Sequence, residues 1–298
     1  MSTQAPAAPS VLDQPVFGRR RSRNPVILSI ARHAVLLLVL FVILYPLLWM
    51  VGASLRPSNE AFGTIGVWSS NLTLDNYRQG WHYGSLNFSR YFLNSVVITG
   101  LCIIGNVFSC SLAAYAFARL EFPFKKVLFA LMLGTMLLPY HVTLVPQYII
   151  FNQLAWINTI LPLVVPKFLA TDAFFIFLMV QFIRTLPREL DDAARLDGCG
   201  HIGIFRRVIL PLAIPAIGTT ALFTFIHTWN DFLGPLLYLN QPDKWTVTQG
   251  LNGFLDATGE SAFGPLFAMA TLSLAPIIGF FLVAQRLLIE GIATSGLK

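Results

Sequence analysis

Long stretches without a charged side chain divide this sequence into apolar segments separated by polar ones. A helix that rises 1.5 Å per residue needs about 20 apolar residues to cross a hydrocarbon core about 30 Å thick. Five runs of that length contain no Asp, Glu, Lys or Arg, at residues 34–55, 91–118, 127–166, 208–230 and 261–285. The third run is too long for one crossing, and Pro139, Pro146 and Pro162 interrupt it. It therefore predicts one helix, a short link and the start of a second helix.

The pattern predicts an all-α polytopic membrane bundle of six transmembrane helices. The expected spans lie at about 30–53, 92–118, 127–146, 160–183, 208–233 and 263–286. Composition supports this class, because 55% of the residues are hydrophobic, only 11% are charged and the mean hydropathy is +0.67. A soluble domain carries about 25% charged residues.

The basic residues predict the orientation of the bundle. With six spans, fifteen of the 20 Lys and Arg residues fall on the side that holds both termini, four fall on the other side, and Lys167 lies within a span. Because basic residues near span ends stay in the cytoplasm, we expect both termini there and the chain in the cytoplasmic (inner) membrane. The net charge of +6 then reflects topology and contact with anionic lipid, and we expect no nucleic-acid partner.

The N-terminal segment differs in composition from the rest. Residues 1–24 are rich in Ala, Pro and Ser and then in Arg, which predicts a disordered, basic cytoplasmic tail over 1–27 before a transmembrane domain over 28–298. A signal peptide is the alternative, with "VGA" at 51–53 as its cleavage site. The apolar run is longer than the 7–15 residues of a signal core, which favours an uncleaved first span.

One motif points towards nucleotide binding, but its context does not. Residues 198–203 spell G-x-G-x-x-G, a pattern that needs a preceding strand and an acid about 20 residues later. The residues before it predict a helix, and "ALFTFIHT" at 221–228 holds no acid. The chain also lacks G-x-x-x-x-G-K-[ST] and H-E-x-x-H. We expect no catalytic residue, no metal site and no cofactor bound by this chain.

Two groups of polar residues interrupt predicted spans. Lys167 and Asp172 lie in the fourth, and charged groups at membrane depth normally face a bundle interior or a polar cavity. Five residues correspond to about 140° around a continuous helix, so we do not expect them to pair. The expected role is a polar lining for a substrate path; for Lys167 the alternative is a side chain that extends to the membrane surface.

The second group lies in "FTFIHTWNDFLGPLLY" of the fifth span, where Trp229 and Asn230 are candidates for the substrate path. An aromatic ring can stack on the C–H face of a sugar while an amide binds its hydroxyls. An ordinary aromatic belt at the membrane interface is the alternative.

The loop between spans four and five predicts a short helix over 187–197. Pro187 suits its first position, acidic residues follow at the positive end of the helix dipole, and Gly198 suits the C-cap. Asp191 and Arg195 are spaced as an i,i+4 ion pair. Leu190, Ala193 and Ala194 fall towards one face, which indicates either docking in a partner's groove or a solvated amphipathic loop helix.

The segment "DDAARLDGCGHIGIFRRVILPLAIP" at 191–215 resembles the EAA loop of ABC-importer permeases. The pattern falls on Asp192-Ala193-Ala194, on Gly198 and on Val208-Ile209-Leu210-Pro211, with Asp in place of Glu and Val in place of Ile. The resemblance implies a cytoplasmic coupling helix that docks an ATPase. The residues it assigns to docking are Glu189, Asp192, Ala193, Ala194, Leu196, Asp197 and Gly198.

Further stretches resemble the second permease of maltose-type carbohydrate importers, so the resemblance covers about 28–298. They are "NSVVITG" at 94–100, "AYAFARLEFPFKK" at 114–126, "LPYHVTLVPQYIIFNQLAWINT" at 138–159, "TFIHTWNDFLGPLLYL" at 224–239 and "EGIATSGLK" at 290–298. The resemblance implies a second permease, two copies of an ATP-binding subunit that holds ATP and Mg, an extracytoplasmic solute-binding protein and a sugar substrate.

The match at the C-terminus implies a regulatory contact with the ATPase through Gly291, Thr294, Gly296 and Lys298. Two alternatives stay open: a permease for glycerol-phosphate or another polyol, and a stand-alone secondary transporter. The second is less favoured, because the sequence shows no clear internal repeat and Asp172 is the one obvious acid at a span centre.

Overall fold

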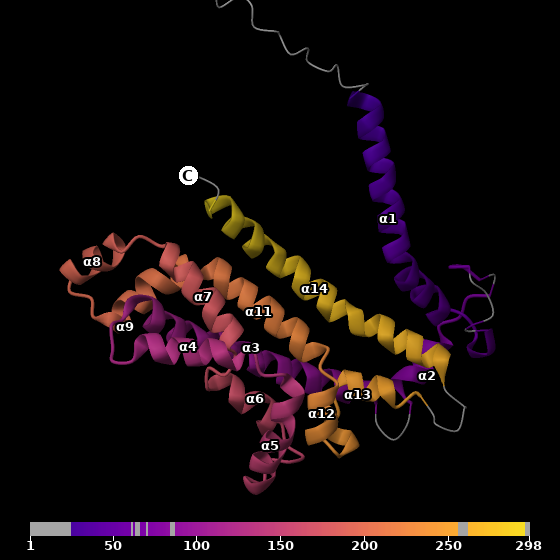
Figure 1. Cartoon of the computed structure of the whole chain (residues 1–298). Helices are drawn as coiled ribbons and strands as arrows, with labels where there is room; N and C mark the ends of the chain where they lie inside the picture. The colour runs from indigo at the N-terminus through magenta and orange to yellow at the C-terminus, as the bar shows by residue number, and fades with distance from the viewer. Residues whose placement is uncertain are drawn as a thin grey trace, which may run out of the picture. The chain divides into compact units, whose positions relative to one another are not determined.

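A computed structural model describes residues 25–60, 62, 66–69, 71–83, 87–255 and 262–295 (Figure 1). The chain divides into two units, residues 1–48 and 49–298. The expected tail lies outside the described residues up to position 24, and its last three residues already belong to the first helix, which begins at Pro25.

The described residues form helices and contain no strand, as the pattern predicts. In chain order the helices are α1 (Pro25–Ser54), η2 (Ser58–Glu60), α2 (Asp75–Trp81), α3 (Phe88–Arg119), α4 (Lys125–Thr135), α5 (Tyr140–Gln153), α6 (Leu161–Phe168), α7 (Ala173–Thr185), α8 (Glu189–Leu196), α9 (His201–Ile204), η3 (Phe205–Ile209), α10 (Leu210–Leu212), α11 (Ile214–Trp229), α12 (Leu233–Tyr238), η4 (Pro242–Lys244), α13 (Val247–Asn252) and α14 (Phe263–Ser295).

The described part contains four candidate membrane spans, or six if each of two bent helix pairs crosses as one span. The four are Leu28–Ser54, Phe88–Arg119, Leu161–Thr185 and Phe263–Gln285. The bent pairs are Lys125–Thr135 with Tyr140–Gln153, at 101°, and His201–Leu212 with Ile214–Trp229, at 75°. These six segments overlap the six expected spans, but the fifth, expected at 208–233, is broken at Ala213 and its helix ends at Trp229.

The third expected span, 127–146, is not the continuous helix that was predicted. Helix α4 ends at Thr135 and α5 begins at Tyr140. Pro139 stands directly before α5 with an extended ψ of 131°, and a proline disfavours helical geometry in the residue before it. The break and the 101° bend therefore have a local cause in the sequence.

The fourth expected span is also broken, between α6 and α7. Helix α6 ends at Phe168, and Ala170 adopts a left-handed φ of 55°. A non-glycine residue in that region ends a right-handed helix. Asp172 then takes the N-cap position of α7, so a short non-helical link lies within the apolar segment.

Helix α3 is the central element of the second unit, and it contacts α6, α7 and α11 (Figure 1). Small and polar side chains line these contacts: Asn106 Nδ2 donates to Thr224 Oγ1 of α11 over 2.9 Å, and Ser109 Oγ donates to the Lys167 carbonyl over 2.7 Å. Such residues let helices approach closely and link them by hydrogen bonds in apolar surroundings.

The two ends of α3 have different cores. At the end near Arg119, a mainly aliphatic cluster on α3 and α7, which also holds Tyr115 and Phe175, packs against α8 and α9. At the other end, a mainly aromatic cluster includes Phe88, Phe225 and Trp229. Figure 1 shows α8 and α2 near these opposite ends of α3.

Candidate functional site

Helix α8 ends in the geometry that the sequence predicts. Gly198 has a φ of 80°, and its N–H donates to the Arg195 carbonyl over 2.9 Å. The N–H of Cys199 donates to the Ala194 carbonyl, also over 2.9 Å. These two bonds form a Schellman motif. The G-x-G-x-x-G spelling therefore starts at a helix C-terminus, which is not the strand-to-helix turn of a dinucleotide site.

The start and the buried face of α8 differ from the prediction. The helix begins at Glu189, not at Pro187, and its buried residues are Asp191 and Ala194. Leu190 is 38% exposed, and Leu196 is 90% exposed. The face that points away from the bundle carries Asp192, Ala193, Leu196 and Asp197, all exposed. An amphipathic helix can lay a face of this kind into a groove of a partner.

An ion pair joins α8 to the end of α3. Arg119 Nε lies 3.1 Å from Asp191 Oδ2, with the two side chains 3% and 8% exposed, and Arg119 Nη2 donates to the Leu186 carbonyl over 2.9 Å. The expected pair of Asp191 with Arg195 is wrong. Arg195 pairs with the exposed Asp192 at 3.2 Å, because Asp191 faces inward onto α3.

Apolar contacts complete the support of α8. Ala194 belongs to a buried cluster with Ile183 of α7 and Ile204 of α9, and Tyr115 of α3 packs on Phe205 with ring centroids 5.2 Å apart. Packed side chains therefore connect α8 and the segment that follows it to α3 and α7.

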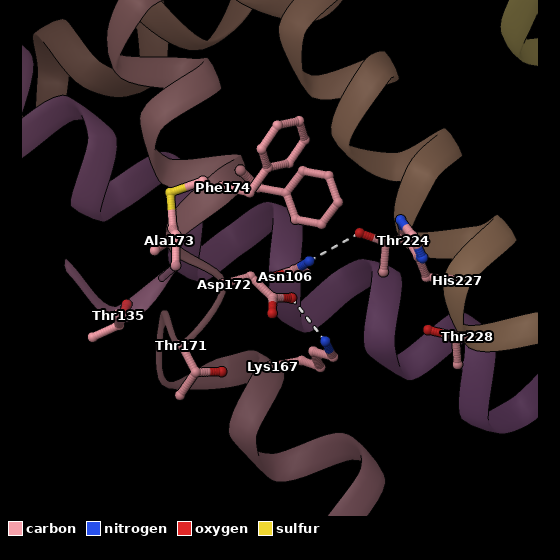
Figure 2. A pocket seen from close by; sticks show the side chains of 12 residues that line it. Asn106, Thr135, Lys167, Thr171, Asp172, Ala173, Phe174, Thr224, His227 and Thr228 are labelled. Atoms are coloured by element: carbon pink, nitrogen blue, oxygen red, sulfur yellow. Dashed lines mark hydrogen bonds and ion pairs between the residues drawn. The ribbon is translucent and has the colours of Figure 1, made fainter. Parts of the chain in front are cut away.

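A polar cavity lies between α3, α11 and the break that separates α6 from α7. Its volume is about 320 Å³. Figure 2 shows Lys167 from the last turn of α6, Asp172 from the start of α7, Asn106 from α3, and Thr224, His227 and Thr228 from α11 around it. A second cavity of about 360 Å³ shares Lys167, Asp172, His227 and Thr228 and adds Ser95, Thr99, Tyr140, Asp231 and Thr246 among its lining.

Lys167 and Asp172 form an ion pair, contrary to the prediction. Lys167 Nζ lies 2.8 Å from Asp172 Oδ2, and the side chains are 30% and 26% exposed (Figure 2). The angular estimate assumed one continuous helix, whereas the turn at Ala170 folds Asp172 back towards the last turn of α6. Both side chains line both cavities, and their role in a substrate path stays a prediction.

Trp229 and Asn230 line neither of these two cavities. Trp229 is 3% exposed, its ring stacks on Phe225 at 5.6 Å, and its Nε1 donates to the Ser273 carbonyl over 3.2 Å. Asn230 is exposed and donates to the Ile226 carbonyl. The side of α11 that faces the cavities carries Thr224, His227 and Thr228. Their spacing of three and four residues is a helical polar stripe that could have identified them.

Of the four C-terminal candidates, two lie in the described part of the chain and two lie outside it. Gly291 and Thr294 fall in the last turns of α14, whereas Gly296 and Lys298 lie outside the described residues. Among the residues that the structure describes, no group of three His, Cys, Asp or Glu side chains is close enough to hold a metal ion.

Comparison with known proteins identifies relatives of this chain. Residues 105–293 match the family model described as "Binding-protein-dependent transport system inner membrane component". The probable ABC transporter permease protein YurM of Bacillus subtilis (strain 168) is 36% identical, over 88% of this chain and 86% of that protein. The arabinooligosaccharides transport system permease protein AraQ of Halalkalibacterium halodurans is 32% identical, over 87% of this chain and 93% of that protein.

A solved structure shares the fold. A chain in the crystal structure of a bacterial ABC transporter involved in the import of the acidic polysaccharide alginate superposes with a TM-score of 0.76 at 20% identity. The match covers 87% of this chain and 96% of that one.

Proposed function

The chain belongs to the family of binding-protein-dependent transport system inner membrane components, and from this premise we propose that it is a permease subunit that imports a sugar or oligosaccharide. In this proposal the chain lies in the cytoplasmic membrane and works with a second permease, two ATP-binding subunits and an extracytoplasmic solute-binding protein. ATP and Mg bind to the ATPase partners, and this chain carries no catalytic residue.

The observation that carries the proposal is the construction of α8. Its outer face is exposed and could contact a partner, with Leu196 90% exposed. On its inner face, Asp191 forms an ion pair with α3 and Ala194 packs against α7. A helix that packs on the bundle with one face and on a partner with the other can pass the partner's movement to the spans. ATP-driven closure of the ATPase pair can then shift the equilibrium between two bundle conformations, provided that the contacts on α8 differ between them.

The cavities support a solute rich in hydroxyl groups. Asn106, Thr224 and Thr228 offer amide and hydroxyl groups, and the pair of Lys167 with Asp172 adds one charge of each sign. Volumes of about 320 and 360 Å³ lie within the usual range of ligand sites. The sugar in the name of the AraQ relative agrees with this chemistry. Glycerol-phosphate or another polyol is the second candidate substrate.

The proposed orientation of the protein in the membrane follows from the distribution of its basic residues. Arg119, Arg184, Arg188 and Arg195 all lie at the end of the bundle that carries α8, and basic residues mark the cytoplasmic side. The proposal places both termini on that side, and it therefore brings the end of α14, which contains Gly291 and Thr294, within reach of an ATPase. We therefore retain the regulatory contact through Gly291, Thr294, Gly296 and Lys298 as part of the proposal.

Native mass measurement of the complex tests this function. The chain is purified from its own cells in mild detergent through a tag, and we expect a heterotetramer with one further permease and two ATPase copies. Leu196→Ser should release the ATPase, while Phe124→Ser, which changes a side chain 77% exposed at the same end of the protein, should leave the complex intact. A 33 kDa chain that purifies alone, even after cross-linking at α8, would favour the secondary transporter.

A further inference from the structure

A third cavity lies away from the proposed substrate path, at the same end of the bundle as α8. Its volume is about 480 Å³, and it is bounded by the end of α3, the first turns of α4 and Arg184 of α7. Its walls combine two chemistries, four phenylalanine rings and three basic side chains with one acid. It shares no lining residue with the two cavities described above, and no residue of α8 lines it.

The phenylalanine rings form a preformed apolar wall. Phe117 contacts Phe122 and Phe129, with ring centroids 5.8 and 5.3 Å apart. The guanidinium carbon of Arg184 lies 5.4 Å above the Phe129 ring. This cation–π contact holds a positive charge at the edge of the apolar wall, where a charged group and a hydrocarbon group of one ligand could bind together.

The basic side chains leave a net positive charge at the mouth of the cavity. Lys125 is already engaged, since its Nζ donates to the Leu120 carbonyl over 2.6 Å and lies 3.1 Å from Glu121 Oε1. Within the described residues, Lys126 and Arg184 form no ion pair. The first turn of α4 also lines the cavity. The Lys125 N–H already donates to the Phe122 carbonyl, whereas the N–H groups of Lys126 and Val127 have no acceptor within the helix. The site is therefore complementary to an anion.

The surface next to the cavity indicates that the anion has a hydrocarbon tail. Val127, Leu128 and Leu131 of α4 are 55%, 47% and 63% exposed, so an apolar track leads away from the basic mouth. The 11 residues of α4 measure about 16 Å, which is close to half of a hydrocarbon core about 30 Å thick. An acyl chain can lie along this track while its headgroup remains at Lys126 and Arg184.

We propose that this cavity, called here the headgroup site and lined by Phe117, Phe129, Lys126 and Arg184, binds one acidic phospholipid of the inner leaflet. The phosphodiester binds Lys126 and Arg184, and the acyl chains run along α4. Basic pockets between helices on the cytoplasmic side are suited to such headgroups. The inference rests on the proposed function for the orientation of this end of the bundle.

Native mass spectrometry of the intact complex, with added phosphatidylglycerol or phosphatidylcholine, tests the site. We expect the complex to retain phosphatidylglycerol and to prefer it over phosphatidylcholine. The double variant K126Q/R184Q should bind phosphatidylglycerol about 25-fold more weakly, since each basic residue near an anionic lipid contributes roughly fivefold. The charge-preserving K126R/R184K should restore retention. The matched control R206Q/R207Q removes two exposed charges from η3 and should match the unaltered protein.

Four results would overturn the proposal. Two concern the lipid: K126Q/R184Q retains as much phosphatidylglycerol as the unaltered protein, or the protein binds phosphatidylglycerol and phosphatidylcholine equally. The other two are retention of inorganic phosphate in place of lipid, and loss of the ATPase from K126Q/R184Q, which would make the cavity a protein interface. The same spectra test the proposed function separately. An intact heterotetramer without bound lipid contradicts the headgroup site alone, whereas absence of the heterotetramer from the unaltered protein contradicts the proposed function.

Discussion

Arg119 and Asp191 form a buried ion pair at 3.1 Å between the last turn of α3 and the inner face of α8. The same guanidinium holds the Leu186 carbonyl at the start of the loop that leads into α8. One side chain therefore fixes both the position of the loop and the face that α8 turns towards the bundle. In the proposed importer, this pair lies on the route from the ATPase to the spans.

Asp191→Asn should destabilise the protein strongly, because it leaves the Arg119 charge buried without a counter-charge. Removing one partner of a buried pair costs about 3–5 kcal/mol, measurable as thermal unfolding of the purified complex. Asp192→Asn is the matched control on the same helix. Its pair with Arg195 is exposed and contributes about 0–1 kcal/mol.

The Asp191→Asn complex that survives purification should also hydrolyse more ATP for each solute imported than the unaltered complex. A looser α8 transmits less of the ATPase movement to α3. A purely structural role predicts a lower yield of protein with an unchanged ratio of hydrolysis to transport, and that result would remove the pair from the coupling route.

Gly198 should tolerate Asn better than Val. Its φ of 80° lies in the left-handed region, and an added Cβ meets nothing within 4 Å. The cost of a side chain is therefore backbone strain, about 1–2 kcal/mol for an ordinary residue and less for Asn. Co-purification of the ATPase should follow the order Gly, Asn, Val. Equal co-purification with Val would show that the Schellman geometry is not required for docking.

Lys167→Met should reduce solute uptake more than the double variant K167M/D172N. The single change leaves the Asp172 carboxylate without its partner at membrane depth, where an unpaired charge is costly. The double change removes both charges. Uptake of labelled solute into vesicles, normalised to the amount of assembled complex, measures the difference. If both variants transport like the unaltered protein, the pair has no role in the path.

Thr224→Val should weaken the packing of α3 on α11. It keeps the shape of the side chain but removes the acceptor of the Asn106 hydrogen bond, and such bonds between membrane helices contribute roughly 0.6 kcal/mol and at most about 1.7. The free energy of unfolding in mixed detergent micelles measures the change. Thr219→Val is the control, since the Thr219 hydroxyl bonds only within α11, to the Pro215 carbonyl.

The sequence by itself predicted the all-helical class, the segments that could cross a membrane, the short helix before Gly198 and its glycine cap. These features depend on residues that are contiguous in the sequence. The length of an apolar run decides whether a helix can span the membrane, and a single residue that can adopt a left-handed φ decides where a helix ends. The resemblance to importer permeases likewise rested on local motifs, and the comparison confirmed it.

Only the tertiary structure decided which polar residues meet. Arg119 reaches α8 from a helix far away in sequence, whereas spacing along α8 alone favours Arg195 as the partner of Asp191. Lys167 pairs with Asp172 because the chain turns at Ala170, a break that no glycine or proline marks at that position. The orientation of α11 placed Thr224 and His227 at the cavities and Trp229 in the core. Spacing along one helix defines its faces, but packing against the other helices determines which face is buried and which lines a cavity.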